Sequence, residues 1–210
     1  MHIQTFLGHL IRPFRKRRMM KFIETFRPRA DQTILDVGGS AYNWDLVNFQ
    51  GSVVMLNLDP VIGEQARANM KFVVGDGTAL AYEDDAFDIV FSNSVIEHVG
   101  GYENQRQMAN EIRRVGRRFF VQTPNKRFPL EPHFLFPWFQ YLPLATRAWL
   151  VNRFDVGWYK RIPDAVAARA EVESIQLLTK GRLSALFPGA RVHEEKLAGL
   201  TKSFVAIDGW

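Results

Sequence analysis

Three acidic residues, Asp36, Asp59 and Asp76, each come at or just after the end of a short apolar run in the first half of the chain, and a fourth, Asp88, follows at a similar interval. The first of them leads directly into a glycine turn, Gly38-Gly39. In an α/β fold, a buried parallel strand brings such a turn to a ligand, and the next strand brings a carboxylate to the two hydroxyls of a ribose. The order of these residues therefore predicts a nucleoside pocket at one edge of a parallel sheet.

The elements that must position these residues alternate between strands and helices. The pattern predicts strands at 33–37, 53–58, 71–74, 87–92 and 118–122, with helices between them, the longest at 105–115. Two later strands, at 190–197 and 203–207, are close enough in sequence to pair antiparallel. We therefore expect a Rossmann-like, doubly wound α/β fold with a mostly parallel seven-stranded sheet and a C-terminal antiparallel hairpin.

A basic segment precedes this sheet. Residues 12–21 contain six basic side chains and no acidic one, and a helix is expected at 15–26. Apolar residues spaced along one face of this helix are Met19, Phe22, Ile23 and Phe26. We predict a basic amphipathic helix within residues 1–28, docked on a domain of residues 29–210 with its basic side outward. That side is either a solvated face or a surface for an anionic membrane.

An insertion rich in aromatic and proline residues follows the fifth strand, at about 125–170. A flexible linker would be polar, so this segment is expected to be ordered. Three interpretations are open: a lid over the pocket, a small core of its own, or a dimer interface. A lid of this composition would favour a partly apolar substrate.

The composition is that of a soluble globular protein. The chain has 210 residues, of which 47% are hydrophobic and 23% are charged. It has no cysteine, which excludes disulfides and thiolate metal sites and fits a reducing compartment. We see no signal peptide and no apolar run near the roughly 20 residues that span a bilayer. The predicted location is cytoplasmic, with peripheral membrane contact as the alternative.

Four local sequences resemble, in order, the motifs of the class I S-adenosylmethionine-dependent methyltransferases. Residues 34–40 look like the first motif, an acid followed by a glycine turn, and residues 56–59 look like the second, whose acid binds the ribose. Residues 74–77 look like the third motif, near the adenine amino group. Residues 87–99 are similar to the strand-four motif of the type 11 branch. The resemblance implies that S-adenosylmethionine is the cofactor.

The resemblance assigns roles to the residues of the first motif. Gly38 and Gly39 would offer their backbone to the cofactor, and Asp36 would organise the turn and reach the cofactor's amino group through water. Ser40 stands where the family often has another glycine, and its hydroxyl can bind the methionine carboxylate.

The later motifs supply the rest of the predicted pocket. By resemblance, Asp59 takes the ribose diol, Asp76 with Gly77 takes the adenine amine, and Asn93 faces the methionine part or the acceptor. The competing interpretation of these acids is turn chemistry, because Asp side chains bind nearby backbone. Asp88 starts its strand, away from the ligand edge, so we expect it to be structural.

Two histidines are the candidate catalytic residues. Methyl transfer needs a base only where the acceptor carries a proton of high pKa. His98 and His133 follow strands four and five on the predicted ligand side, where each could act as acid/base or line the pocket. We attribute Glu97 to a capping box with Ser94. No metal site is predicted, because the two histidine segments lack metal-ligand spacing.

The sequence thus favours a methyltransferase that acts on oxygen or carbon of a small, partly apolar acceptor, with lipid-like molecules among the candidates. The alternative is a non-catalytic, methyltransferase-like module that binds a partner protein or a membrane surface. A nicotinamide dinucleotide domain is disfavoured because residues 38–43 lack the Gly-x-Gly-x-x-Gly fingerprint. Nucleic-acid substrates are disfavoured because the Asn-Pro-Pro-aromatic signature is absent after strand four.

Overall fold

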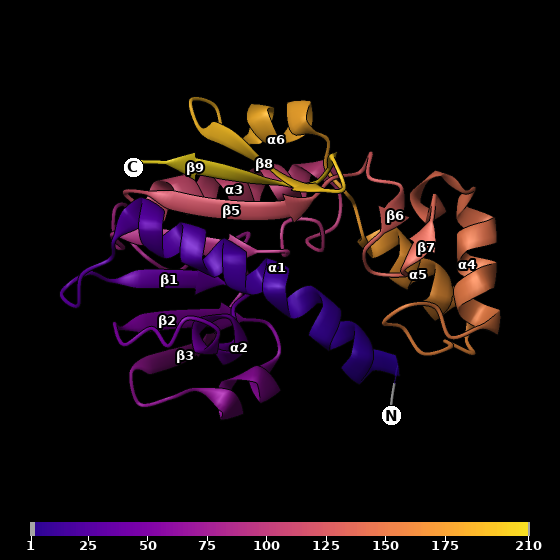
Figure 1. Cartoon of the computed structure of the whole chain (residues 1–210), viewed down its shortest axis with the longest axis horizontal. Coiled ribbons are helices and arrows are strands. Elements are labelled where there is room, and N and C mark those ends of the chain that lie inside the picture. Colours follow the sequence, from indigo (N-terminus) through magenta and orange to yellow (C-terminus); the bar gives the residue numbers. More distant parts are fainter. Residues whose placement is uncertain (1–2, 210) are drawn as a thin grey trace. The chain divides into compact units, whose positions relative to one another are not determined.

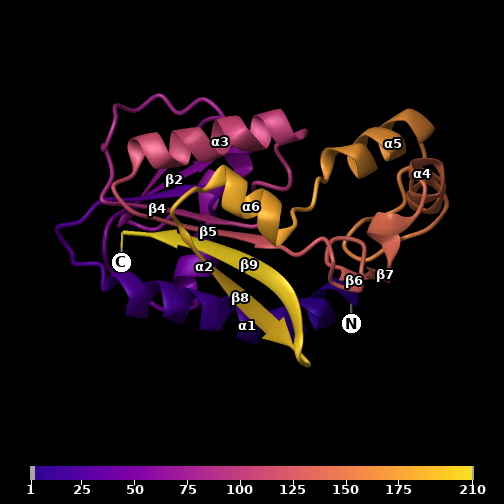
Figure 2. The same cartoon turned by 90° about the horizontal axis from the view of Figure 1, so that it is seen from above.

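The computed structural model describes residues 3–209, with only the backbone described for residues 3–11, 64 and 65. Its seven-stranded sheet has the order β3-β2-β1-β4-β5-β9-β8 (Figure 1). The strands are β1 Ile34–Val37, β2 Val53–Asn57, β3 Met70–Val74, β4 Ile89–Asn93, β5 Phe119–Pro124, β8 Arg191–Leu197 and β9 Leu200–Asp208. β1 pairs in parallel with β2 and with β4, and β2 pairs in parallel with β3. β8 and β9 form the antiparallel C-terminal pair (Figure 2), so the predicted fold class is confirmed.

Six α-helices and two short 3₁₀ helices are assigned in the described residues. The α-helices are α1 Ile3–Phe26, α2 Ala41–Asp45, α3 Tyr102–Val115, α4 Leu144–Arg153, α5 Ala165–Ser174 and α6 Lys180–Leu186. The 3₁₀ helices are η1 Pro60–Gln65 and η2 Phe139–Tyr141, and a two-stranded sheet joins β6 Leu130–Glu131 to β7 Phe136–Pro137. Local sequence explains two helix starts: Asp164 accepts a hydrogen bond from Ala167 N, and Thr179 accepts one from Arg182 N.

The helix expected to open at Ser94 does not form. Residues 94–99 form turns and bends, and Ser94 has a φ of +57°. Its hydroxyl donates to Gln122 Oε1 at 2.8 Å instead of capping a helix. Glu97 is fully buried and accepts a hydrogen bond from Thr123. The capping-box interpretation was therefore wrong, because burial of Glu97 takes its side chain away from the backbone it would have capped.

The chain forms two compact units. The first comprises Met1–Asn93, Gln107–Val121 and Ile207–Trp210, and the second comprises Ser94–Arg106 and Gln122–Ala206. In the first unit, the Phe22 ring of α1 packs against aromatic rings of the sheet and of α2, with centroid distances of 5.1 Å to Phe91, 5.6 Å to Phe120 and 5.8 Å to Trp44. The predicted apolar face of α1 is thus the face that docks.

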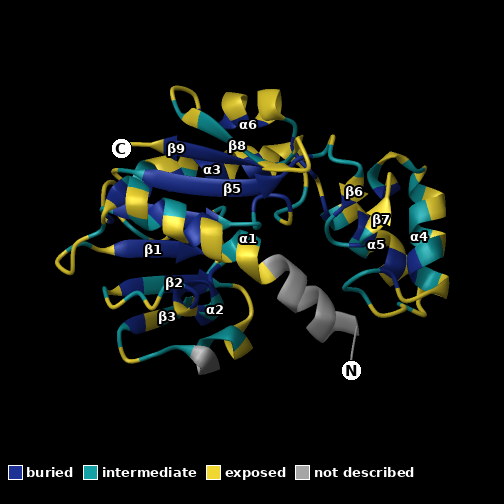
Figure 3. Ribbon diagram, in the orientation of Figure 1, coloured by how far each residue is buried: buried dark blue, intermediate teal, exposed yellow. Residues whose placement is uncertain are grey.

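The second unit has an apolar cluster that combines residues of the predicted insertion with residues just after it. Its buried residues are Phe134, Phe139, Val151, Val156, Ala168, Val172, Ile175 and Leu177. α4 and α5 pack together here (Figure 3). The insertion is therefore ordered and contributes to a small apolar core, while its role as a lid and the limits 1–28, 29–210 and 125–170 remain predictions. None of the helices that the structure describes is both long and apolar enough to cross a membrane.

Candidate cofactor site and imidazole cluster

The glycine turn after β1 is closely packed in the first unit. All four residues of β1 are buried between β2 and β4. Gly38 has a φ of +74°, and its amide donates to Leu56 O at 2.7 Å. A Cβ added to Gly39 would lie 2.2 Å from Asp36 Cγ. Glycine is therefore needed at position 38 for its left-handed backbone conformation, and at position 39 for the space that it leaves to the Asp36 side chain.

Asp36 is a buried carboxyl with an unfilled acceptor. It is 1% exposed, and its Oδ2 accepts a hydrogen bond from Trp44 Nε1 at 2.7 Å. Oδ1 is buried and has no partner among the described residues. Burial raises the pKa of Asp36 to about 7, although the Trp44 hydrogen bond opposes the shift. A carboxyl in this state suits a cationic ligand group, and the amino group of a methionine moiety is one.

The end of β2 contacts the glycine turn through a residue that sequence reasoning did not single out. Asn57 Nδ2 donates to Gly39 O at 3.1 Å, and its Oδ1 accepts from Asp59 N at 3.1 Å. Asp59 is exposed and caps η1 by accepting from Val61 N at 3.0 Å. Its other oxygen has no partner among the described residues. The sequence signal that could have identified Asn57 is its position: it is the last residue of β2, at the strand end next to the glycine turn.

We predict that Asn57→Ala weakens cofactor binding about tenfold, because the turn loses the hydrogen bond that holds Gly39 O. Calorimetric titration with S-adenosylhomocysteine measures this affinity. In a separate experiment, Asp59→Ala should lower the free energy of unfolding by about 1 kcal/mol, because η1 loses its cap, and urea unfolding measures this effect. Unchanged affinity in Asn57→Ala would show that the turn does not depend on this contact.

The loop after β3 also lies against β1. A Cβ added to Gly77 would lie 2.8 Å from Val37 Cγ1, so glycine permits this approach. Asp76 Oδ1 accepts from both Thr78 N and Thr78 Oγ1 at 2.8 Å, which is turn chemistry. At the start of β4, Asp88 accepts from Thr33 N at 2.8 Å. That bond keeps the pKa of Asp88 low and is structural.

Two arginines of α1 contact this part of the first unit. Arg18 is 6% exposed and donates to Asn93 Oδ1, at the end of β4. The Arg15 guanidinium lies 5.4 Å from the ring centroid of Tyr42, in α2. The basic side of the helix is thus not wholly outward, contrary to expectation. The sequence alone did not distinguish Arg15 and Arg18, which contact the domain, from the other four basic residues of this segment.

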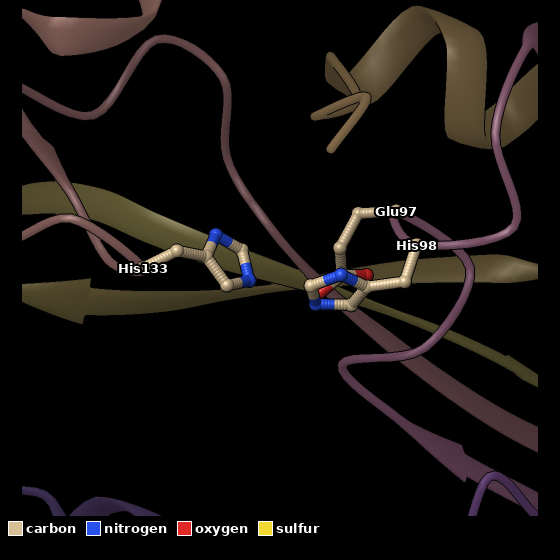
Figure 4. A group of neighbouring side chains, drawn as sticks. All are labelled: Glu97, His98 and His133. Atoms are coloured by element: carbon tan, nitrogen blue, oxygen red, sulfur yellow. The ribbon is translucent and has the colours of Figure 1, made fainter. Parts of the chain in front are cut away.

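The second unit holds a cluster of Glu97, His98 and His133. Each offers one nitrogen or oxygen atom of a kind that binds metals, and these atoms all lie within 4.8 Å of one another. The His98 and His133 rings are perpendicular, with centroids 4.7 Å apart. Figure 4 shows a nitrogen of His133 directed toward His98, with the Glu97 side chain beside the His98 ring. The structure therefore brings together the two predicted catalytic histidines.

Glu131 fixes the orientation of His133. It is 2% exposed, and its Oε1 lies 2.7 Å from His133 Nδ1. Its Oε2 accepts from the backbone amides of His133 at 2.8 Å and Phe134 at 2.6 Å. Burial alone would lower the pKa of His133, but the hydrogen bond and charge of Glu131 raise it overall. The pKa of His98 is lowered, by partial desolvation and by the neighbouring His133.

Hydrogen bonds hold both sides of this cluster. Glu97 Oε2 accepts from Thr123 Oγ1 at 2.9 Å, and Glu97 O accepts from Gln176 N at 2.7 Å. His133 O accepts from Trp158 N at 3.1 Å. Among the described residues, the His98 side chain has no hydrogen-bond partner. The ring of His98 is therefore the adjustable member of a cluster whose other members are anchored.

The sheet order and the glycine-turn site define the class of the protein: it has the Rossmann-like fold of the class I methyltransferases. Residues 35–118 match the family model of a methyltransferase domain, the type 11 model. The match confirms the resemblance of this part of the chain to the class I S-adenosylmethionine-dependent methyltransferases. S-adenosylmethionine is the cofactor that this family implies.

Solved structures share the fold at low sequence identity. A protein from Pyrococcus horikoshii OT3 matches with a TM-score of 0.58 and 17% identity, over 99% of this chain and 91% of that one. A SAM-dependent methyltransferase from Methanosarcina mazei matches with a TM-score of 0.53 and 16% identity, over 89% and 95%.

A third match is a chain of the Haloferax volcanii complex between the Trm112 methyltransferase activator and a methyltransferase. Its TM-score is 0.56 at 15% identity, over 97% of this chain and 93% of that one. At these identities the likeness shows the fold alone. No curated protein matches the sequence.

Proposed function

We propose that the protein transfers a methyl group from S-adenosylmethionine to an oxygen or carbon atom of a small, partly apolar acceptor. The observation that supports this most is Asp36, a buried carboxyl with an unpartnered oxygen beside a glycine turn. S-adenosylmethionine, when bound, supplies a methyl group already activated on a sulfonium. The chain's residues then have to bind, orient and desolvate.

The glycine turn and the end of β4 would hold the methionine part. Gly38 and Gly39 offer backbone, and Asp36 accepts from the amino group directly or through water. Ser40 precedes α2, and its hydroxyl does not cap that helix, which leaves it available to the methionine carboxylate. Asn93 would complete this side, oriented by its hydrogen bond from Arg18.

The ends of β2 and β3 would hold the adenosine part. Asp59 has one carboxylate oxygen engaged in capping η1, and the second is available for a ribose hydroxyl. Asn57 forms hydrogen bonds with the backbone of both Gly39 and Asp59, and it thereby holds these two residues in position. Asp76 would accept from the adenine amine, with Gly77 giving the base room beside Val37.

His98 and His133 are assigned to the activation of the acceptor. Glu131 holds the His133 ring in one orientation. The aromatic side chains of the insertion support an apolar acceptor, and several are more than half exposed: Trp138, Tyr141, Trp149 and Phe154. A lipid-like acceptor and contact with an anionic membrane remain predictions.

Calorimetric titration with S-adenosylmethionine and S-adenosylhomocysteine tests the proposal. We expect both to bind with micromolar affinity, as in a preformed pocket. If neither binds, the proposed function is overturned and a non-catalytic role follows. Binding would justify a screen of small phenols, enols and hydroxylated apolar compounds as acceptors, with S-adenosylhomocysteine release as the readout.

A further inference from the structure

We propose that Glu97, His98 and His133 bind a divalent transition-metal ion of the Zn²⁺ type, and that this ion takes the acceptor through an oxygen atom. The ion site rests only on the residues of the second unit. The assignment of an oxygen acceptor to it rests on the proposed methyltransferase function.

The donor set is that of a catalytic metal site. Two imidazoles and one carboxylate are preferred by Zn²⁺, and related ions bind the same set. Three protein ligands leave at least one coordination position open, whereas structural zinc sites use four. Because the chain has no cysteine, any such site must use nitrogen and oxygen ligands.

The geometry is close to that needed. Tetrahedral ligands at about 2.1 Å from Zn²⁺ lie about 3.4 Å from one another. The three ligand atoms here all lie within 4.8 Å, so closure requires only small side-chain rotations. His98 can make most of this movement because its side chain has no hydrogen-bond partner among the described residues. In Figure 4 one ring nitrogen of His133 is directed toward the His98 ring, and the Glu97 carboxylate lies beside that ring.

The surroundings of the ligands have the pattern found around metal sites. A metal-bound histidine usually donates its second ring nitrogen to a carboxylate, which fixes the ring and strengthens it as a ligand. Glu131 is in this position on His133 Nδ1, at 2.7 Å, which leaves Nε2 for the ion. Thr123 Oγ1 binds Glu97 Oε2 at 2.9 Å and orients the carboxylate in a comparable way. Both supporting groups are buried.

A bound ion would activate an acceptor hydroxyl without a strong base. Coordination lowers the pKa of a bound O–H group, so its proton passes to water near neutral pH. The acceptor oxygen then forms the new O–CH₃ bond while the C–S bond breaks and its electron pair returns to sulfur. This favours oxygen over carbon as the methylated atom, and phenols, enols or hydroxyls as the acceptor class.

Titration of untagged, chelator-treated full-length protein with Co²⁺ tests the site, followed by competition with Zn²⁺. We expect one equivalent of Co²⁺ to bind with a visible absorption band, and Zn²⁺ to abolish the band. His98→Ala and His133→Ala should each weaken binding at least 100-fold. Glu131→Gln should weaken it about 10- to 100-fold while preserving one equivalent, because it keeps the shape but not the charge of the partner.

His193→Ala is the matched control, because it removes an imidazole outside the cluster and should leave Co²⁺ binding unchanged. Circular dichroism of each variant verifies the fold. Absence of Co²⁺ binding, or binding unaffected in both His98→Ala and His133→Ala, would overturn the metal site. S-adenosylhomocysteine titration of the same samples separates the two proposals, since cofactor binding without Co²⁺ binding leaves the methyltransferase intact and removes only the ion.

Discussion

Replacing Gly39 by alanine should abolish measurable binding of S-adenosylmethionine. The added Cβ would lie 2.2 Å from Asp36 Cγ and 2.7 Å from Asp36 Cβ, distances that atoms do not tolerate. Because Asp36 is buried and its Oδ2 is held by Trp44, either this side chain or the turn must shift, and both shifts disturb groups proposed to bind the cofactor. We expect a loss of at least about 100-fold in affinity, or about 2.7 kcal/mol, together with overpacking that costs about 1–3 kcal/mol of stability.

Gly181→Ala provides the control for this substitution. Gly181 lies in α6, where nothing is within 4 Å of an added Cβ. Alanine there should raise the free energy of unfolding by about 0.5–1 kcal/mol and leave cofactor affinity unchanged. Thermal unfolding of Gly39→Ala first establishes that it is folded, and calorimetry then measures binding. Wild-type affinity in a folded Gly39→Ala protein would remove the glycine turn from the proposed site.

The fold could be predicted from sequence because its signals are local. Most of the parallel strands are short apolar runs closed by an acid, a glycine or a proline, and alternation with helices leaves few topologies. The prediction failed where a tertiary contact overrides the local pattern. Ser94 and Glu97 have the sequence of a capping box, but Thr123 and Gln122, from β5, bind these side chains instead.

For the candidate cofactor site, the sequence predicted the residues of the glycine turn, but it did not predict which side chains form hydrogen bonds with one another. Asp36 and the two glycines follow from the strand-turn pattern. Arg18 does not, because its hydrogen bond to Asn93 joins residues 75 positions apart. The approach of Glu97 and His98 to His133 is equally invisible in spacing, since the segments are connected through α3 and β5. The proposed metal site depends on such a long-range approach, which is why residue spacing in the sequence predicted no metal site.

The stability of the protein should fall as pH rises from 5 to 7, because of Asp36. Burial raises the pKa of this carboxyl to about 7 in the folded state, against an ordinary value near 3.8. Between these values the folded state binds a proton that the unfolded state has released. The stabilisation is therefore complete below the unfolded pKa, declines with increasing pH, and is lost once pH exceeds the folded pKa. One pKa unit corresponds to about 1.4 kcal/mol, and the folded-state carboxyl is half ionised at pH 7, so we expect a decline of about 2 kcal/mol between pH 5 and pH 7.

Asp36→Asn isolates this contribution. Its amide oxygen can still accept from Trp44 Nε1, and no proton is bound or released. Subtracting its pH profile of unfolding free energy from that of the wild type should leave the predicted decline; parallel profiles would show that the Asp36 carboxyl does not titrate in this range.

Cofactor affinity should change with pH in the opposite direction in the wild type. It should increase from pH 5.5 to pH 7, because the cationic amino group binds the ionised form of Asp36, and it should be flat over this range in Asp36→Asn. The same buried carboxyl would then destabilise the unliganded protein near neutral pH and favour the liganded one, which is the behaviour expected of a group kept for binding at a cost in stability.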